Sequence, residues 1–199
     1  CQLNKFYLHN LARYNRVLMQ RNRLLKDIAF KPQLEDSLSV WDEELVKYGQ
    51  AIIRLRREFI ESLQDKLIRI HKNISGGREE LLLSYEENVR EEAFSEAIIK
   101  ARDTEKKQRI TLVGPHRDDL LFQINGEDIR KFGSQGQKRT AALSLKLAEI
   151  ELVKEKIEDY PILLLDDVVT TGASIREATR VLCAAGVHSV TVGALARVW

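Results

Sequence analysis

The sequence predicts an α/β protein from which a long antiparallel helical hairpin, similar to a coiled coil, extends as an arm. Three observations lead to this class: apolar residues recur at helical spacing over the first 74 residues, strand patterns alternate with helices beyond residue 80, and turn-forming residues are few. Of 199 residues, 31% are charged, and only 10 are Gly and 3 are Pro. Soluble domains average about 25% charged residues, so this composition is typical of long charged helices and excludes collagen-like and disordered chains.

Composition and patterning also exclude membrane-spanning and disulfide-rich classes. Apolar runs fall well short of the roughly 18 residues of a membrane span, and the basic first thirty residues contain no apolar signal-peptide core. We therefore expect a cytoplasmic protein without a membrane partner. The two cysteines, Cys1 and Cys183, are too few for a disulfide framework. Because the chain opens on Cys1 and its only methionine is Met19, we expect that it does not begin where its gene begins.

The first thirty residues predict one face of a long helix. Six positions at heptad spacing carry five apolar residues and one arginine: Leu11, Tyr14, Leu18, Arg21, Leu25 and Ile28. Residues 29–37, which include Pro32, break the pattern and predict a short turn.

A second, longer helix is predicted after this turn. Ser39 followed by Asp42 resembles a capping box, and apolar residues then continue from Trp41 to Ile74 in steps of three and four. Gly76 and Gly77 follow, as expected past a helix end. Because the connecting turn is short, the two helices should be antiparallel neighbours that form an arm over residues 1–77.

Shorter elements are predicted beyond the arm. Asn125-Gly126 is a typical hairpin turn between strands. A short apolar run before two carboxylates is typical of a buried sheet strand, and the strand, turn, helix, strand order at the end of the chain favours α/β topology. The expected strands are 80–86, 110–113, 120–124, 162–165 and 189–195, and the expected helices are 89–102, 134–156 and one that follows a polar loop and ends near residue 185.

Two segments together could bind a nucleotide. In the first, Ser134 lies between glycines at a helix start, where a hydroxyl, backbone N–H groups and the helix dipole can meet phosphate oxygens. In the second, a strand ends in Asp166 and Asp167, which could hold Mg²⁺ and orient an attacking water. Each segment alone is also compatible with an ordinary helix cap or a solvated strand end.

The stretch from Tyr7 to Val168 resembles the RecF family of DNA replication and repair proteins. The resemblance covers about 160 residues and rests on long motifs in the order of the family. They are Asn10–Tyr14, Gln20–Asn22, Trp41–Glu43, Ile74–Gly77, Gly114–Leu120, Ile124–Gly126 and Phe132–Glu149.

This resemblance implies an ATP-driven DNA clamp with a partial ABC-type ATPase head of the SMC type over residues 78–168. A homodimer would hold ATP and Mg²⁺ between its heads, bind single-stranded, gapped or duplex DNA, and act with other mediators in SOS-linked recombinational repair. Asp166 would bind Mg²⁺ and Asp167 would be the catalytic acid. ATP held by the partner head would contact Ser134, Gln135, Gly136, Gln137 and Arg139.

The sequence departs from the family in two ways. It contains no Gly-rich phosphate loop ending in Lys-Ser or Lys-Thr, so we expect that the chain does not hydrolyse ATP alone. Residues 169–199 instead resemble the tail of ComF-type phosphoribosyltransferases. In that alternative function, Asp166 and Asp167 would meet ribose hydroxyls, and a 5-phosphate would lie against Thr170, Thr171, Gly172, Ala173 and Ser174. The junction suggests a fusion, natural or introduced by sequence assembly.

Basic residues are concentrated in the arm although the net charge is only +2. Residues 1–31 hold seven Lys or Arg against one acid, and residues 54–72 hold six. Such stripes suit a phosphate backbone, although they are equally typical of solvated helix surfaces. The candidate DNA contacts are Arg13, Arg16, Arg54 and Arg57. For the charged loop Gly114–Asp119, a surface ion pair and a role at the head both remain open.

Overall fold

The computed structural model describes residues 4–155, 162–166 and 190–194, and the chain divides into two compact units, 1–148 and 149–199. Helices and a small antiparallel sheet build the first unit, and a parallel pair of strands lies in the second. Within the described ranges, no helix is long and apolar enough to cross a membrane. The functional boundaries expected at residues 77 and 168 stay predictions.

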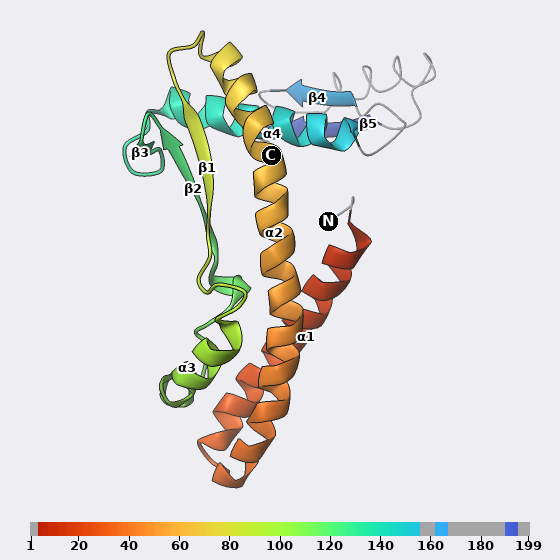
Figure 1. Cartoon of the computed structure of the whole chain (residues 1–199), viewed down its shortest axis with the longest axis vertical. Coiled ribbons are helices and arrows are strands. Elements are labelled where there is room, and N and C mark those ends of the chain that lie inside the picture. The colour runs from red at the N-terminus through yellow and green to blue at the C-terminus, as the bar shows by residue number, and fades with distance from the viewer. Residues whose placement is uncertain (1–3, 156–161, 167–189, 195–199) are drawn as a thin grey trace. The chain divides into compact units, whose positions relative to one another are not determined.

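The predicted helical hairpin is present. Helix α1 spans Lys5–Ile28, a 3-10 turn covers Pro32–Ser37, and α2 runs antiparallel to α1 over Leu38–Ile74 (Figure 1). At about 1.5 Å per residue, the 37 residues of α2 extend over roughly 55 Å. Helix α1 has 24 residues and pairs with the first part of α2 only, which leaves the second part of α2 to other elements.

Helix α3, Phe94–Gln108, packs on the hairpin. Phe94 and Ile98 are fully buried in one apolar cluster with residues of α1 and α2. Close approach requires Gly49 of α2, because a Cβ there would lie 2.3 Å from Cε1 of Phe94. The sequence predicts this helix over residues 89–102, and the observed helix begins five residues later and ends six residues later.

A three-stranded antiparallel sheet lies along the second part of α2 (Figure 1). Its strands are β1, Leu81–Glu86, β2, Asp119–Ile124, and β3, Glu127–Asp128, in the order β1-β2-β3. The predicted turn between β2 and β3 is confirmed, since Asn125 and Gly126 both have positive φ, 52° and 86°. Leu81 and Leu83 alternate on the buried face of β1.

Two local predictions are wrong. Residues 110–113 form no strand, because side chains satisfy their backbone: Thr111 N donates to Asn22 Oδ1, 2.8 Å, and Leu112 N to a carboxylate oxygen of Glu105, 2.6 Å. The capping box is also absent, because α2 already begins at Leu38 and Asp42 is buried in an ion pair. Tertiary contacts, invisible in the local pattern, decide both segments.

The remaining elements carry the nucleotide motifs. Helix α4 spans Gln135–Lys154, and Ala141, Ser144 and Ala148 lie on its buried face. In the second unit, β4, Ile162–Asp166, pairs in parallel with β5, Val190–Ala194, with Ile162 opposite Val190. The strands expected over 162–165 and 189–195 are thus present, whereas the polar loop and the helix expected between them lie outside the described residues.

Candidate functional site

The start of α4 is a reciprocal capping box. Gln137 N donates to Ser134 Oγ, 3.1 Å, and Ser134 N donates to Gln137 Oε1, 2.9 Å. Ser134 Oγ uses a lone pair for this bond and keeps its hydroxyl hydrogen. Within the described residues, that hydrogen and the N–H groups of Gln135 and Gly136 have no acceptor. The start of α4 therefore offers three exposed donors to an anion.

The two glycines of this motif have different roles. A Cβ on Gly133 would lie 2.5 Å from the backbone oxygen of Ile129, so the fold itself requires glycine there. A Cβ on Gly136 would meet only Ser134 Oγ, at 3.8 Å. Nothing in the described structure fills the space above Gly136, and the backbone there is open to a close ligand.

The other predicted nucleotide residues are only partly described. Arg139 is exposed in the second turn of α4. Asp166 ends β4 in the second unit, whereas Asp167, Thr170, Thr171, Gly172, Ala173 and Ser174 lie outside the described residues. Among the described side chains, no three of His, Cys, Asp and Glu gather as metal ligands.

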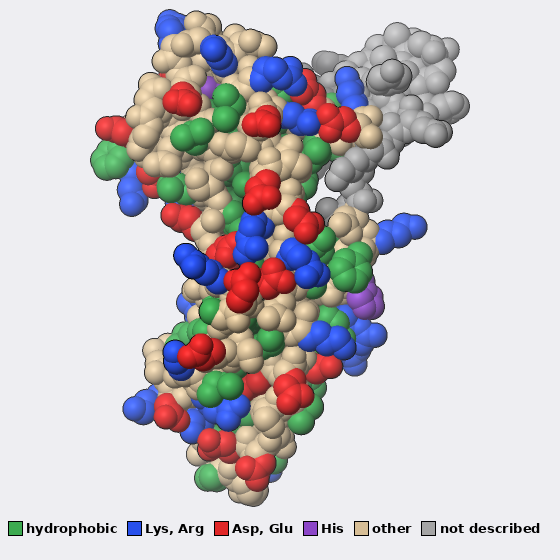
Figure 2. Space-filling view, in the orientation of Figure 1, with side chains coloured by type: hydrophobic (Ala, Val, Ile, Leu, Met, Phe, Trp, Pro, Cys, Tyr) green, Lys and Arg blue, Asp and Glu red, His purple; other side chains and the backbone are tan. Residues whose placement is uncertain are grey.

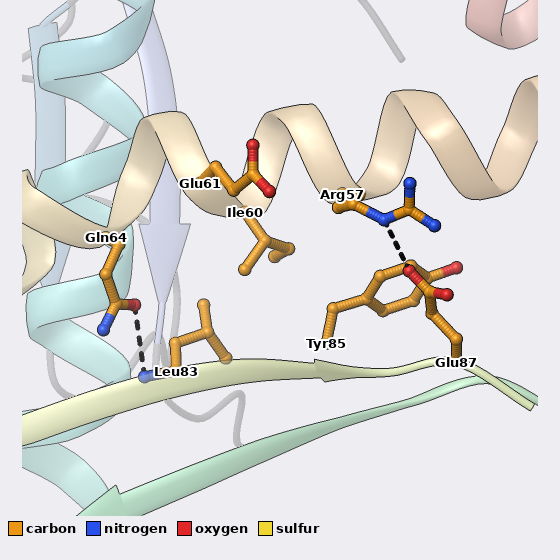
Figure 3. Close-up of a pocket in the computed structure, with 7 residues that line it drawn as sticks. All are labelled: Arg57, Ile60, Glu61, Gln64, Leu83, Tyr85 and Glu87. Atoms are coloured by element: carbon orange, nitrogen blue, oxygen red, sulfur yellow. Dashed lines mark hydrogen bonds and ion pairs between the residues drawn. The ribbon is translucent and has the colours of Figure 1, made fainter. Parts of the chain in front are cut away.

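The four candidate DNA contacts fall into two pairs. Arg13 and Arg16 are exposed on α1 and have no ion-pair partner among the described residues. Arg54 pairs with Glu91, 3.3 Å, and Arg57 donates through Nε to Glu87, 2.7 Å, beside a groove between α2 and β1 (Figure 3). Figure 2 shows the same contrast: Lys and Arg over the middle of α2 lie among Asp and Glu, whereas others gather over α1.

The charged loop before β2 joins β1 and β2 to the arm. Asp118 accepts hydrogen bonds from the Tyr85 hydroxyl, from Arg56 Nη1, 2.9 Å, and from Asn88 N, 2.9 Å. Burial, together with this carboxylate, raises the pKa of the Tyr85 phenol. The Asp118 carboxylate is thus satisfied by two partly buried side chains and one exposed backbone N–H, while the neighbouring Asp119 pairs with Arg130 at the surface.

His116 of the same loop is fixed in one tautomer by its two neighbours. Its Nε2 lies 3.2 Å from the carbonyl oxygen of Thr111, which only accepts, so Nε2 carries the hydrogen. The Tyr14 hydroxyl, 2.7 Å from Nδ1, then donates. Burial lowers the pKa of His116 and raises that of Tyr14. Gly114 is required here, since φ is 135° and a Cβ would lie 2.4 Å from Tyr14 Oη.

No family model matches the chain, but individual proteins do. A protein named DNA replication and repair protein RecF, from Agathobacter rectalis, is 56% identical over 170 residues, 85% of this chain and 47% of that protein. The protein of the same name from Bacillus subtilis is 43% identical over 188 residues, 89% and 51% of the two chains. A structure described as the recombination mediator protein RecF-ATPrS in the RecFOR pathway matches with TM-score 0.77 and 35% identity, covering 96% of this chain and 54% of that one.

The chain belongs to the RecF family. It spans about half the length of the curated RecF relatives that it matches. The resemblance drawn from the sequence motifs is thereby confirmed. The predicted fold class, a long helical arm with part of an ABC-type ATPase, is confirmed as well. The RecF relatives give no support to the phosphoribosyltransferase alternative, and the loop that would carry it lies outside the described residues.

A buried network centred on Arg21 is the feature of this RecF-family chain that sequence reasoning missed. Arg21 is fully buried and pairs with Asp42, 2.7 Å, and Glu105, 2.6 Å, while its Nη1 donates to Thr111 Oγ1, 2.8 Å. The signal was present, because Arg21 occupies an apolar heptad position of α1. An arginine at such a position predicts buried carboxylate partners, but the sequence alone does not name them.

Proposed function

We propose that this chain acts as part of a RecF-type, ATP-dependent DNA-binding protein in replication and SOS-linked recombinational repair in the cytoplasm. The observation that carries the proposal is the start of α4, where Ser134 is held as a cap while its hydroxyl hydrogen and two neighbouring N–H groups remain exposed. These donors fit the phosphate oxygens of ATP held by a second head. Two relatives by fold are described as RecF bound to ATP or an ATP analogue, which supports this assignment.

Further residues would complete the nucleotide site between the heads of a homodimer. Arg139 would add positive charge one turn into α4. Asp166, the last residue of β4, would bind Mg²⁺, and Asp167, the next residue in the sequence, would be the catalytic acid. Bound Mg²⁺ would neutralise phosphate charge and help to position water. Since the sequence contains no phosphate loop ending in Lys-Ser or Lys-Thr, the chain by itself should not turn over ATP.

Helix α1 is the proposed DNA-binding surface. Arg13 and Arg16 are exposed and have no acidic partner in the part of the chain that the structure describes, and Arg23 and Lys26 continue the exposed basic positions of the helix. Arg54 and Arg57 were predicted as equal contacts, but their carboxylate partners compete with phosphate. We therefore assign the main phosphate contacts to α1, for single-stranded, gapped or duplex DNA presented together with other recombination mediators.

Salt-dependent binding tests the DNA assignment. Fluorescence anisotropy of labelled gapped DNA should show affinity falling steeply with salt, and Arg13→Glu with Arg16→Glu should lower affinity at least tenfold and reduce the slope by about 2. The matched control is Arg54→Glu with Arg57→Glu, which should weaken binding less. Equal losses in the two double variants would refute the assignment to α1.

ATP-dependent association tests the nucleotide assignment. The chain is mixed with the complete RecF protein of Agathobacter rectalis and ATP, and sedimentation should show a complex that Ser134→Ala weakens about tenfold or more. A complex that forms equally well without ATP, or that ignores Ser134→Ala, would refute the role of α4.

A further inference from the structure

The capping box of α4 is held in place from the end of the arm. Gln137 Nε2 donates to Glu79 Oε1, 3.1 Å, while Gln137 Oε1 accepts from Ser134 N, 2.9 Å. Both ends of the amide are therefore engaged, and the side chain cannot rotate without losing a bond. Glu79, in the segment between α2 and β1, thus fixes the residue that caps Ser134.

His71 ties Glu79 to the last turn of α2. The imidazole is fully buried, its Nε2 lies 3.2 Å from Glu79 Oε2, and its Nδ1 lies 3.0 Å from Ser144 Oγ of α4. Gln137 and Ser144 are seven residues apart and share one face of α4, two turns from each other. His71 at the end of the arm and Glu79 just beyond it therefore contact α4 at two points, Ser144 and Gln137.

Apolar packing alone would not set the position of α4 so closely. Between Gln137 and Ser144 the buried apolar side chain is Ala141, 2% exposed, and the next one, Ala148, lies one turn beyond Ser144. Apolar contact is non-directional, whereas a hydrogen bond depends on distance and angle and is lost by about 3.6 Å. A shift of α4 by one residue, about 1.5 Å along its axis, would lengthen and misalign both hydrogen bonds.

We propose that Glu79, held by His71, is a positioning residue for the Ser134 donor group of α4. It sets the amide of Gln137, and through it the direction in which Ser134 and the first N–H groups of α4 point. A displacement of the last turn of α2 is thereby transmitted to the nucleotide contact. This inference rests on the proposed function, because Ser134 matters in this way only if it meets ATP.

Amide hydrogen exchange of the chain, measured without nucleotide, tests whether Glu79 holds the capping box of α4. Glu79→Ala should raise exchange at the backbone N–H groups of Ser134 and Gln137 about fivefold to tenfold, the effect of losing one hydrogen bond. Glu80→Ala is the matched control, because Glu80 is exposed and bonds Asn125 through its backbone only. Glu79→Gln keeps one acceptor oxygen and should rescue most of the protection, also if Glu79→Ala proves too unstable to study. Unchanged exchange in both Glu79 variants would overturn the inference.

ATP-dependent association with the complete Agathobacter rectalis protein then separates positioning from a purely structural tie. Glu79→Ala should weaken the complex at least fivefold, Glu79→Gln less, and Glu80→Ala not at all. The urea concentration at the midpoint of unfolding should be the same for the three variants, so that a difference in stability does not explain the result. If Ser134→Ala weakens the complex but Glu79→Ala does not, the positioning role is wrong and the proposed function stands. If Ser134→Ala has no effect, both fall, and any change in exchange reports only a structural contact.

Discussion

Two polar clusters built from RecF-family motif residues differ in how completely their hydrogen bonds are satisfied. Around Arg21, every nitrogen of the guanidinium has a partner within 2.8 Å and the side chain is fully buried. At the start of α4, Ser134 and Gln137 bond each other but leave neighbouring donors exposed. The comparison teaches that a motif whose donors are all used stabilises the fold, whereas one that keeps free donors can bind a ligand.

The Arg21 cluster joins three helices at one point. Asp42 of α2 accepts from Arg21 and also from Arg102 of α3, 2.6 Å, and Glu105 of α3 accepts from Arg21 and from Leu112 N. A buried ion pair contributes little compared with apolar packing, but removal of one partner leaves the other charges uncompensated. The cluster therefore selects one packing of α1, α2 and α3.

Arg21→Ala should have the largest effect on stability. It leaves Asp42 and Glu105 buried with too few positive partners and opens a cavity, so we expect a loss of about 3–5 kcal/mol in urea unfolding. Arg23→Ala, exposed two residues later on α1, is the matched control and should change the unfolding free energy by less than about 0.5 kcal/mol. Similar losses in the two variants would show that the cluster is not the site that stabilises the hairpin.

The sequence was most informative where local rules decide the structure. The spacing of apolar residues, together with turn-forming and capping residues, predicted α1, α2, the turn at Asn125-Gly126 and the start of α4. Each of these signals acts over a few neighbouring positions in the sequence. Thr111 and Asp42 defeated the same rules, since their backbone or side chain is satisfied by residues more than 20 positions away. The ion pairs of Arg54 with Glu91 and of Arg57 with Glu87 could not be predicted for the same reason, since the partners lie 30 or more positions away in the sequence.

Glycine substitutions in one motif should separate stability from binding. Gly133→Ala places a Cβ against the Ile129 backbone and should cost about 1–3 kcal/mol of unfolding free energy. Gly136 lies in the first turn of α4 beside open space, so Gly136→Ala should leave the free energy of unfolding unchanged or raise it by up to about 1 kcal/mol. We expect ATP-dependent association to fall in Gly136→Ala nonetheless. A destabilised Gly136→Ala would mean that this glycine, too, serves the fold.

The smallest expected effect is a dependence of stability on pH at His116, which belongs to the fully bonded class. Burial lowers its pKa in the folded chain below the ordinary value of 6.5, so the unfolded chain binds the proton more readily. The neutral imidazole accepts from Tyr14 and donates to Thr111, and nearby Arg117 opposes a second proton, whereas Asp118 and Glu105 favour it.

The sign follows from this difference: the contribution of His116 is present above pH 6.5 and is lost as the pH falls below that value. Urea unfolding at pH 7.5 and pH 5 should therefore show a larger loss at acid pH for the native chain than for His116→Gln, whose amide can occupy the same space without titrating. The comparison between the two proteins removes the shared contribution of the carboxylates and the other histidines. An equal loss of stability in the native chain and in His116→Gln would show that the Tyr14–His116 contact does not require a neutral imidazole. The loop would then be held against the arm by hydrogen bonds that do not change with pH.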